Sequence, residues 1–163
     1  MIKIKKLHHS AYRCKNSEQT RRFYVDFLNL QLTKAFIIKV TKSGRKTNVL
    51  HTFYTLKDGS SIAFFEDPST FFEFKDQRDF DLHIAFEVDP RDLSFFFHKG
   101  KSLGVETRGI IDHGFIKSIY FRDPNGYVIE LSSPVSRVKK QTEAQINKIF
   151  SDWKNTKPKN FYS

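Results

Sequence analysis

Cysteine is nearly absent from this chain. Cys14 is alone among 163 residues, so no disulfide bond can form within the chain. A cytoplasmic, reducing compartment is therefore expected. No run of eighteen apolar residues occurs, which excludes a membrane-spanning helix, and the first residues lack the apolar core of a secretory signal peptide. What remains is a chain long enough for one domain with a substantial core.

Acidic residues are few relative to basic ones, and the formal net charge is +10. Half of that excess lies in residues 136–163, where seven lysines and arginines face two acidic residues, a net charge of +5. We interpret this segment as a solvated basic tail. The chain has no RNA-recognition, zinc-finger or helix-turn-helix signature, so nucleic acid is not an expected partner.

One pattern occurs twice along the chain. His9 opens the sequence HSAYRC and His83 opens HIAFEV, and each copy continues into a Phe-rich segment, a turn and an apolar strand. Superposing the copies places His9 on His83 and Ala63 on Glu130. The spacings, 74 and 67 residues, differ by seven, which fits the longer polar turn at residues 41–48.

The periodicities predict a strand, a helix and three strands in each copy, hence an α+β fold. Two such βαβββ modules in tandem are expected to form an open, cleft-like mixed β-sheet with helices outside. The expected strands are 4–14, 35–40, 49–56 and 61–65 in repeat 1 (about 4–66), and 82–88, 105–110, 117–122 and 127–131 in repeat 2 (about 81–134). The expected helices are 17–29 and 90–101.

Together the repeats make one domain, residues 1–135, followed by a basic C-terminal helix and tail, residues 136–163. Residues 142–153 show helical periodicity, with Ile146, Ile149, Phe150 and Trp153 on one face. We expect this apolar stripe to dock on the domain or on a second subunit.

Two histidines and a carboxylate at equivalent points of a duplicated unit form a ligand set for one metal ion. His9, His83 and Glu130 would leave about three positions of an octahedral ion open, enough for a bidentate substrate and a further ligand. Imidazole and carboxylate suit divalent metals, with Fe(II) favoured and Mn(II), Ni(II) or Zn(II) as alternatives. His8 is adjacent to His9, but only one of them can point inward from a strand.

These residues resemble the vicinal oxygen chelate superfamily, which includes glyoxalase I, bleomycin resistance proteins and extradiol ring-cleavage dioxygenases. The resemblance covers roughly residues 4–134 and rests on His9, on the segment 17–30, on the run from His83 to Phe86 and on the run DPNGYVIEL that contains Glu130. It implies the paired-module fold, a small-molecule substrate and a homodimer, but it does not specify the reaction.

Three positions bear on the reaction that the resemblance implies. Ala63 stands where glyoxalase I-like enzymes carry a fourth metal ligand, a Glu, and therefore argues against glyoxalase chemistry. Tyr120 stands where extradiol dioxygenases keep a substrate-contacting Tyr, and His113 nearly matches their His-Gly pair. Tyr120 and His113 are thus candidate catalytic residues, with a half-buried strand tyrosine and a loop histidine as the ordinary alternatives.

One departure counts against the dioxygenase interpretation. Two-module extradiol enzymes carry an acid–base His before the second metal His, but residues 67–81 contain none, and His51 is a weak replacement candidate. The favoured hypothesis is an Fe(II)-dependent extradiol-type dioxygenase, single-module and small, acting on a catecholic or other vicinal-oxygen substrate. The alternatives are a glyoxalase I-like lyase or isomerase, a thiol transferase, and a non-catalytic small-molecule-binding resistance module.

Overall fold

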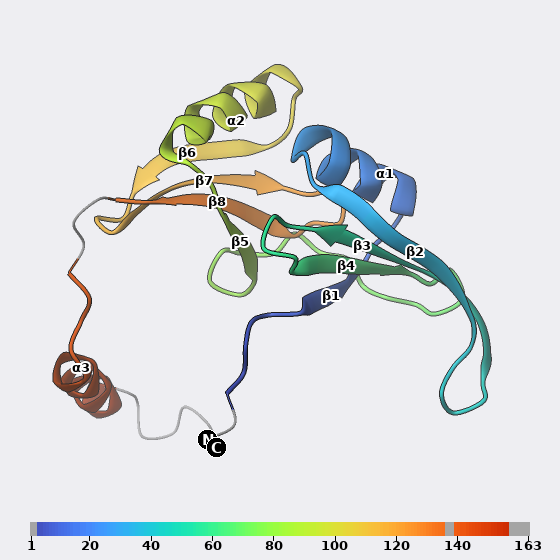
Figure 1. Ribbon diagram of the computed structural model, residues 1–163, viewed down its shortest axis with the longest axis horizontal. Coiled ribbons are helices and arrows are strands. Elements are labelled where there is room, and N and C mark those ends of the chain that lie inside the picture. The colour runs from blue at the N-terminus through green and yellow to red at the C-terminus, as the bar shows by residue number, and fades with distance from the viewer. Residues whose placement is uncertain (1–2, 136–138, 157–163) are drawn as a thin grey trace.

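The first half of the chain forms one four-stranded sheet. The structure is a computed structural model that describes residues 3–135 and 139–156. The strands of this sheet are β1 (His9–Arg13), β2 (Gln31–Val40), β3 (Lys46–Thr55) and β4 (Ser61–Glu66), in the order β1-β4-β3-β2. β1 and β4 are parallel and the other pairs are antiparallel. One continuous helical segment, α1 (Ser17–Arg21) and the π-helical turn η1 (Arg22–Phe27), covers one face of the sheet (Figure 1).

The second half repeats this plan in a separate sheet. β5 (His83–Glu87) is followed by α2 (Pro90–Ser102), β6 (Thr107–Asp112), β7 (Ile116–Arg122) and β8 (Val128–Pro134), in the order β5-β8-β7-β6. The parallel pair is β5 with β8, as β1 is with β4. The predicted fold class, two tandem βαβββ modules with open mixed sheets and outer helices, is therefore confirmed.

Local chemistry accounts for where both helices begin. The Asn16 side chain accepts a hydrogen bond from the Gln19 amide at 2.9 Å, and the Glu66 carboxylate accepts one from the Ser17 amide at 2.7 Å. α2 starts at Pro90, whose fixed φ suits the first helical position. Sequence reasoning predicted both starts, but it gave no sign that Arg22–Phe27 would wind as a π-helix.

The core lies between the helices and the sheets and is dominated by aromatic rings. Tyr24, Tyr54 and Phe64 are fully buried in the first half, and Ile119 and Ile129 in the second. The buried phenylalanines among the described residues, Phe23, Phe27, Phe64 and Phe121, all belong to this core. Their burial is the main favourable contribution to folding.

The β7–β8 turn joins the two halves. The buried carboxylate of Asp123 accepts hydrogen bonds from the Tyr24 hydroxyl of η1 at 3.1 Å and from the Asn125 and Tyr127 amides, each at 2.9 Å. Asn125 in turn accepts a bond from the Lys15 amide at 2.8 Å. The turn that closes the second sheet is thereby anchored to the helix of the first.

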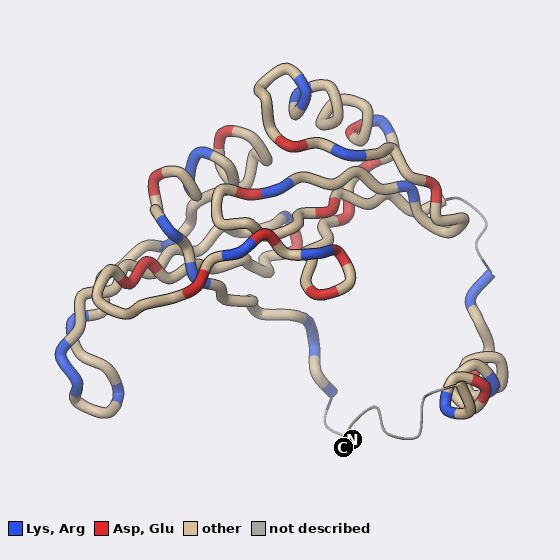
Figure 2. Tube along the Cα trace, turned by 180° about the vertical axis from the view of Figure 1, so that it is seen from behind, with Lys and Arg blue, Asp and Glu red and all other residues tan. Residues whose placement is uncertain are grey.

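The C-terminal helix stands apart from the sheets in Figure 1. This helix, α3 (Glu143–Thr156), leaves its apolar stripe exposed, so the expected docking on the domain does not occur within this chain. Residues 136–138 and 157–163 of the basic tail lie outside the described residues. Figure 2 shows further lysines and arginines on the β2–β3 hairpin and near the N-terminus. None of the described helices is long and apolar enough to span a membrane.

Candidate metal centre

Strand register brings three of the predicted site residues onto one face of the second sheet. Glu130 on β8 lies opposite Tyr120 on β7 and opposite Ala85 on β5. His83 is two residues before Ala85, so its side chain leaves the same face as that of Glu130. The helix α2 covers the other face, which carries Ile129 and Leu131 into the core.

Glu130 is a buried carboxylate held by two hydroxyl groups. Its Oε1 accepts hydrogen bonds from Ser118 Oγ at 2.5 Å and from Ser132 Oγ at 2.7 Å. Its Oε2 lies 3.3 Å from Nε2 of His83. With only 4% of the residue exposed, the carboxylate is fixed in direction, and one oxygen remains directed toward the histidine.

The His83 ring is held by its other nitrogen. Nδ1 lies 2.7 Å from the backbone carbonyl of Asp79, and because a carbonyl can only accept, Nδ1 carries the proton. In the neutral ring this leaves the lone pair on Nε2, the atom beside Glu130. Metal-ligating histidines are typically held in this way by a carbonyl or carboxylate. His83 and Glu130 therefore fit two positions of a metal site.

Tyr120 and His113 form a pair next to this carboxylate. The Tyr120 hydroxyl and His113 Nε2 are 2.9 Å apart, and Tyr120 is 8% exposed. Burial, and then the negative charge of Glu130, raises the pKa of Tyr120 above its usual value. The hydroxyl is consequently protonated at neutral pH, and when His113 Nε2 is the donor of their shared bond, the hydroxyl proton is free to be donated to another acceptor.

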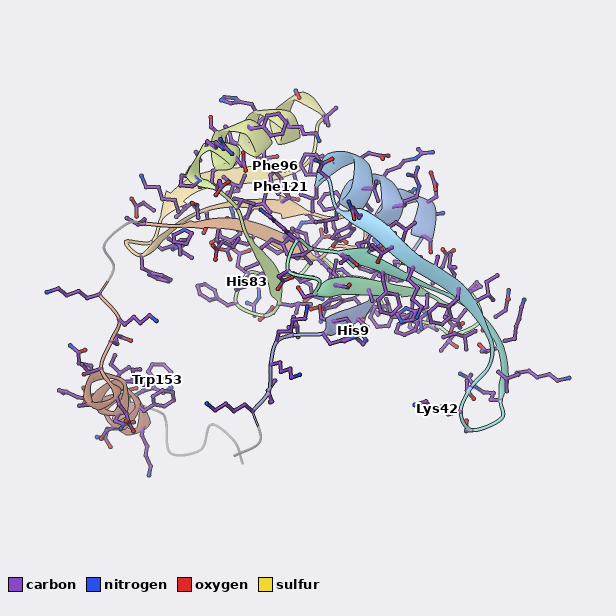
Figure 3. The ribbon with its side chains drawn as sticks, viewed as in Figure 1. His9, Lys42, His83, Phe96, Phe121 and Trp153 are labelled. Carbon is purple, nitrogen blue, oxygen red and sulfur yellow. The ribbon has the colours of Figure 1, made fainter. Side chains whose placement is uncertain are left out.

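His9, the third predicted ligand, lies on the first sheet. β1 and β5 are both edge strands, and Figure 3 shows His9 and His83 on these separate strands. His9 is exposed and shares a 2.8 Å contact between Nδ1 atoms with His8. Across residues 3–135 and 139–156, no three His, Cys, Asp or Glu side chains are close enough together to hold one metal ion.

The strand registers agree with the superposition of the two sequence copies. Ala63 lies opposite Ala11 in the first sheet, just as Glu130 lies opposite Ala85 in the second. The first module thus offers no carboxylate at the equivalent point. Glu66 caps α1 through its contact with the Ser17 amide.

The face of the first sheet that carries His9 is aromatic. His51 stacks on Phe65 with ring centroids 3.7 Å apart, and Phe53 lies 5.4 Å from His9 and 4.4 Å from His51. Phe36 extends the cluster at the strand edge and is 40% exposed. Burial lowers the pKa of His51, so this ring is neutral at neutral pH.

Sequence reasoning missed the residues that support the predicted ligands. Ser118 is two residues from Tyr120 on β7, and Ser132 is two residues from Glu130 on β8. Residues two apart on a strand share a face, so the sequence could have predicted that both serines lie beside the carboxylate. The carbonyl of Asp79 offered no signal, since any residue supplies one. Arg13, two strand positions beyond Ala11 on the face that carries His9, lies 3.6 Å from the Asp67 carboxylate.

Comparison with known proteins places the chain in a family. The model of the Glyoxalase/Bleomycin resistance protein/Dioxygenase superfamily matches residues 6–131. The chain therefore belongs to this superfamily. No curated protein matches the sequence.

Several solved structures have a similar fold. A glyoxylase/bleomycin resistance protein/dioxygenase domain from Frankia sp. is 18% identical, with a TM-score of 0.66 over 82% of this chain and 100% of that chain. A fosfomycin resistance protein, FosX, from Listeria monocytogenes in complex with Mn(II) and 1S,2S-dihydroxypropylphosphonic acid is 22% identical, with a TM-score of 0.61 over 82% and 96% of the two chains. A glyoxalase/dioxygenase from Nostoc punctiforme is 21% identical, with a TM-score of 0.61 over 80% and 92%. At these identities the likeness concerns the fold.

Proposed function

We propose that this protein is a metal-dependent enzyme whose divalent ion is held by His83, Glu130 and His9. The observation that carries the proposal is the pair formed by His83 Nε2 and Glu130 Oε2, 3.3 Å apart, each fixed by hydrogen bonds on its far side. An imidazole lone pair and a buried carboxylate oxygen directed at one point are typical metal ligands. Membership of the superfamily supports the same conclusion.

A second copy of the chain supplies His9 in this proposal. Within one chain the described residues bring two ligands together, not three, and His9 lies exposed on the edge strand of the other sheet. Two copies related by a twofold axis would pair the first sheet of each with the second sheet of the other, giving two equivalent sites. In this proposal the metal site requires the homodimer that the sequence predicts, because the second copy provides the third ligand.

The favoured reaction is extradiol-type ring cleavage of a catecholic or other vicinal-oxygen substrate, with Fe(II). The aromatic face beside His9 offers Phe53 and Phe36 for stacking on a planar ring. Tyr120, protonated and paired with His113, would donate a hydrogen bond to a substrate oxygen near Glu130. The bound metal would lower the pKa of a coordinated substrate hydroxyl.

A second candidate is a reaction on a small phosphonate. The structural likeness to FosX in complex with Mn(II) and a dihydroxypropylphosphonic acid favours it. The glyoxalase alternative is weaker because Ala63 supplies no fourth ligand, and nothing in the described residues favours a thiol transferase. A non-catalytic binding module would not need the ordered pair of His83 and Glu130.

Metal content and oxygen uptake test the proposal. Tag-free protein purified anaerobically is expected to hold close to one divalent metal per chain, and His83→Ala is expected to lose it. His98→Ala, an exposed histidine on α2, is the matched control. Fe(II) together with oxygen uptake on a catechol panel supports ring cleavage, and Tyr120→Phe should then lower kcat with metal content unchanged. Another metal together with turnover of a small phosphonate supports the second candidate. No metal after reconstitution refutes both.

A further inference from the structure

The segment between the two sheets, residues 67–82, has no helix or strand but is held by arginines. Arg13 donates to the carbonyls of Asp67 and Thr70, each at 2.9 Å, at the start of the segment. Arg122 donates to the carbonyl of Gln77 at 3.0 Å, near its end. The segment is therefore a fixed strap that leads directly into His83.

A third arginine, Arg108 on β6, binds the strap beside the candidate metal centre. Its guanidinium forms an ion pair with the carboxylate of Asp79. Asp79 is the residue whose backbone carbonyl accepts a hydrogen bond from His83 Nδ1, with the two atoms 2.7 Å apart. The side chain of Asp79 is thus tied to β6 while its carbonyl orients the histidine.

The same guanidinium also covers Tyr120. Arg108 lies 5.0 Å from the centroid of the Tyr120 ring, a distance typical of cation–π stacking. A planar guanidinium can stack on a ring and pair with a carboxylate at the same time, which an ammonium group does less well. Arg108 therefore contacts the catalytic candidate Tyr120 directly, and reaches His83 through one intervening residue.

We propose that Arg108 is a positioning residue, which through Asp79 fixes the ring of the metal ligand His83 and at the same time sets the Tyr120 ring. This inference rests on the proposed function, because it assigns His83 a ligand role. The ion pair is partly exposed and weak by itself, with 56% of the Arg108 and 34% of the Asp79 side chain accessible. Its effect is geometric, since it limits where the Asp79 carbonyl can lie.

The test is Mn²⁺ binding by Arg108→Met, measured by electron paramagnetic resonance in the intact protein. The variant keeps an unbranched, flexible apolar stem but loses the charge and the planar group. We expect the dissociation constant for Mn²⁺ to rise about three- to tenfold, less than for direct partners of metal ligands. Arg108→Lys should restore part of the loss, and Asp79→Asn should weaken binding in the same direction.

Hydrogen exchange of the metal-free protein provides a second readout. The amides of Asp81 and Leu82, which bond to the Arg78 carbonyl, should exchange faster in Arg108→Met. Arg91→Met, at an exposed arginine on α2, is the matched control and should change neither readout. If wild-type protein binds no Mn²⁺, the proposed function fails. If wild-type protein binds it and Arg108→Met binds it equally well, only the role of Arg108 is refuted.

Discussion

The anchor between the two halves of the chain can be tested with two tyrosines that share one environment. Tyr24 and Tyr54 are both fully buried, and their rings are 5.4 Å apart. The Tyr24 hydroxyl donates to the buried Asp123 carboxylate, whereas the buried Tyr54 hydroxyl has only the Thr52 hydroxyl beside it and makes no hydrogen bond of normal geometry to another described residue. Phenylalanine at either position removes one oxygen atom and leaves the ring.

The expected changes in the free energy of unfolding differ in sign. A hydrogen bond to a charged group contributes about 1.5 to 3 kcal/mol, so Tyr24→Phe should destabilise the protein by that amount. Removing an unpaired buried hydroxyl relieves a desolvation cost, so Tyr54→Phe should be neutral or stabilising by up to about 1 kcal/mol. Asp123 keeps its bonds from Asn125 and Tyr127 in both variants.

Urea unfolding at equilibrium measures both changes. Metal should be removed by chelation and the protein concentration kept constant, because ligand binding and association both shift apparent stability. If the free energies of unfolding of the two variants differ by less than about 0.5 kcal/mol, the hydrogen bond from Tyr24 to Asp123 does not stabilise the junction, and the reasoning is refuted.

Two further predictions concern stability. Burial lowers the pKa of His51 below its usual value of 6.5, so the folded state resists protonation and stability should fall as pH drops through 6.5. His51→Phe keeps an aromatic ring on Phe65, and its stability should change less between pH 7.5 and 5.5; an unchanged pH dependence would contradict this. Gly100→Ala would raise helix propensity, yet its Cβ would meet Thr107 and Phe121, so thermal unfolding should show a loss of about 1 to 3 kcal/mol. A higher melting temperature would show that the two side chains move aside without cost.

The element order could be read from the sequence because two signals agreed. Alternating apolar residues indicated the strands, and the expected helix starts at residues 17 and 90 agree with α1 and α2. The duplication then fixed which residues are equivalent. Boundaries were less certain: β1 begins at His9, although the apolar alternation suggested a start at residue 4.

What escaped prediction depends on contacts between distant segments. The hydrogen bond from Tyr24 to Asp123 joins residues 99 positions apart, so no local sequence pattern predicts it. The same holds for Arg108, which reaches the strap 29 residues earlier in the chain. That His83 and Glu130 share one face of their sheet could be predicted, because side chains alternate along strands, but the position of His9 relative to them depends on how whole sheets pack.

A paired-variant experiment tests most directly whether two copies share the metal centre. His9→Ala and His83→Ala chains, each with its own affinity tag, are coexpressed, and heterodimers are isolated on both tags in turn. Both residues are exposed, so neither change should disturb the core. A shared site predicts about one metal ion per heterodimer, because one of its two sites keeps all three ligands, and none in either homodimer. Metal-free heterodimers would contradict a site shared between two copies.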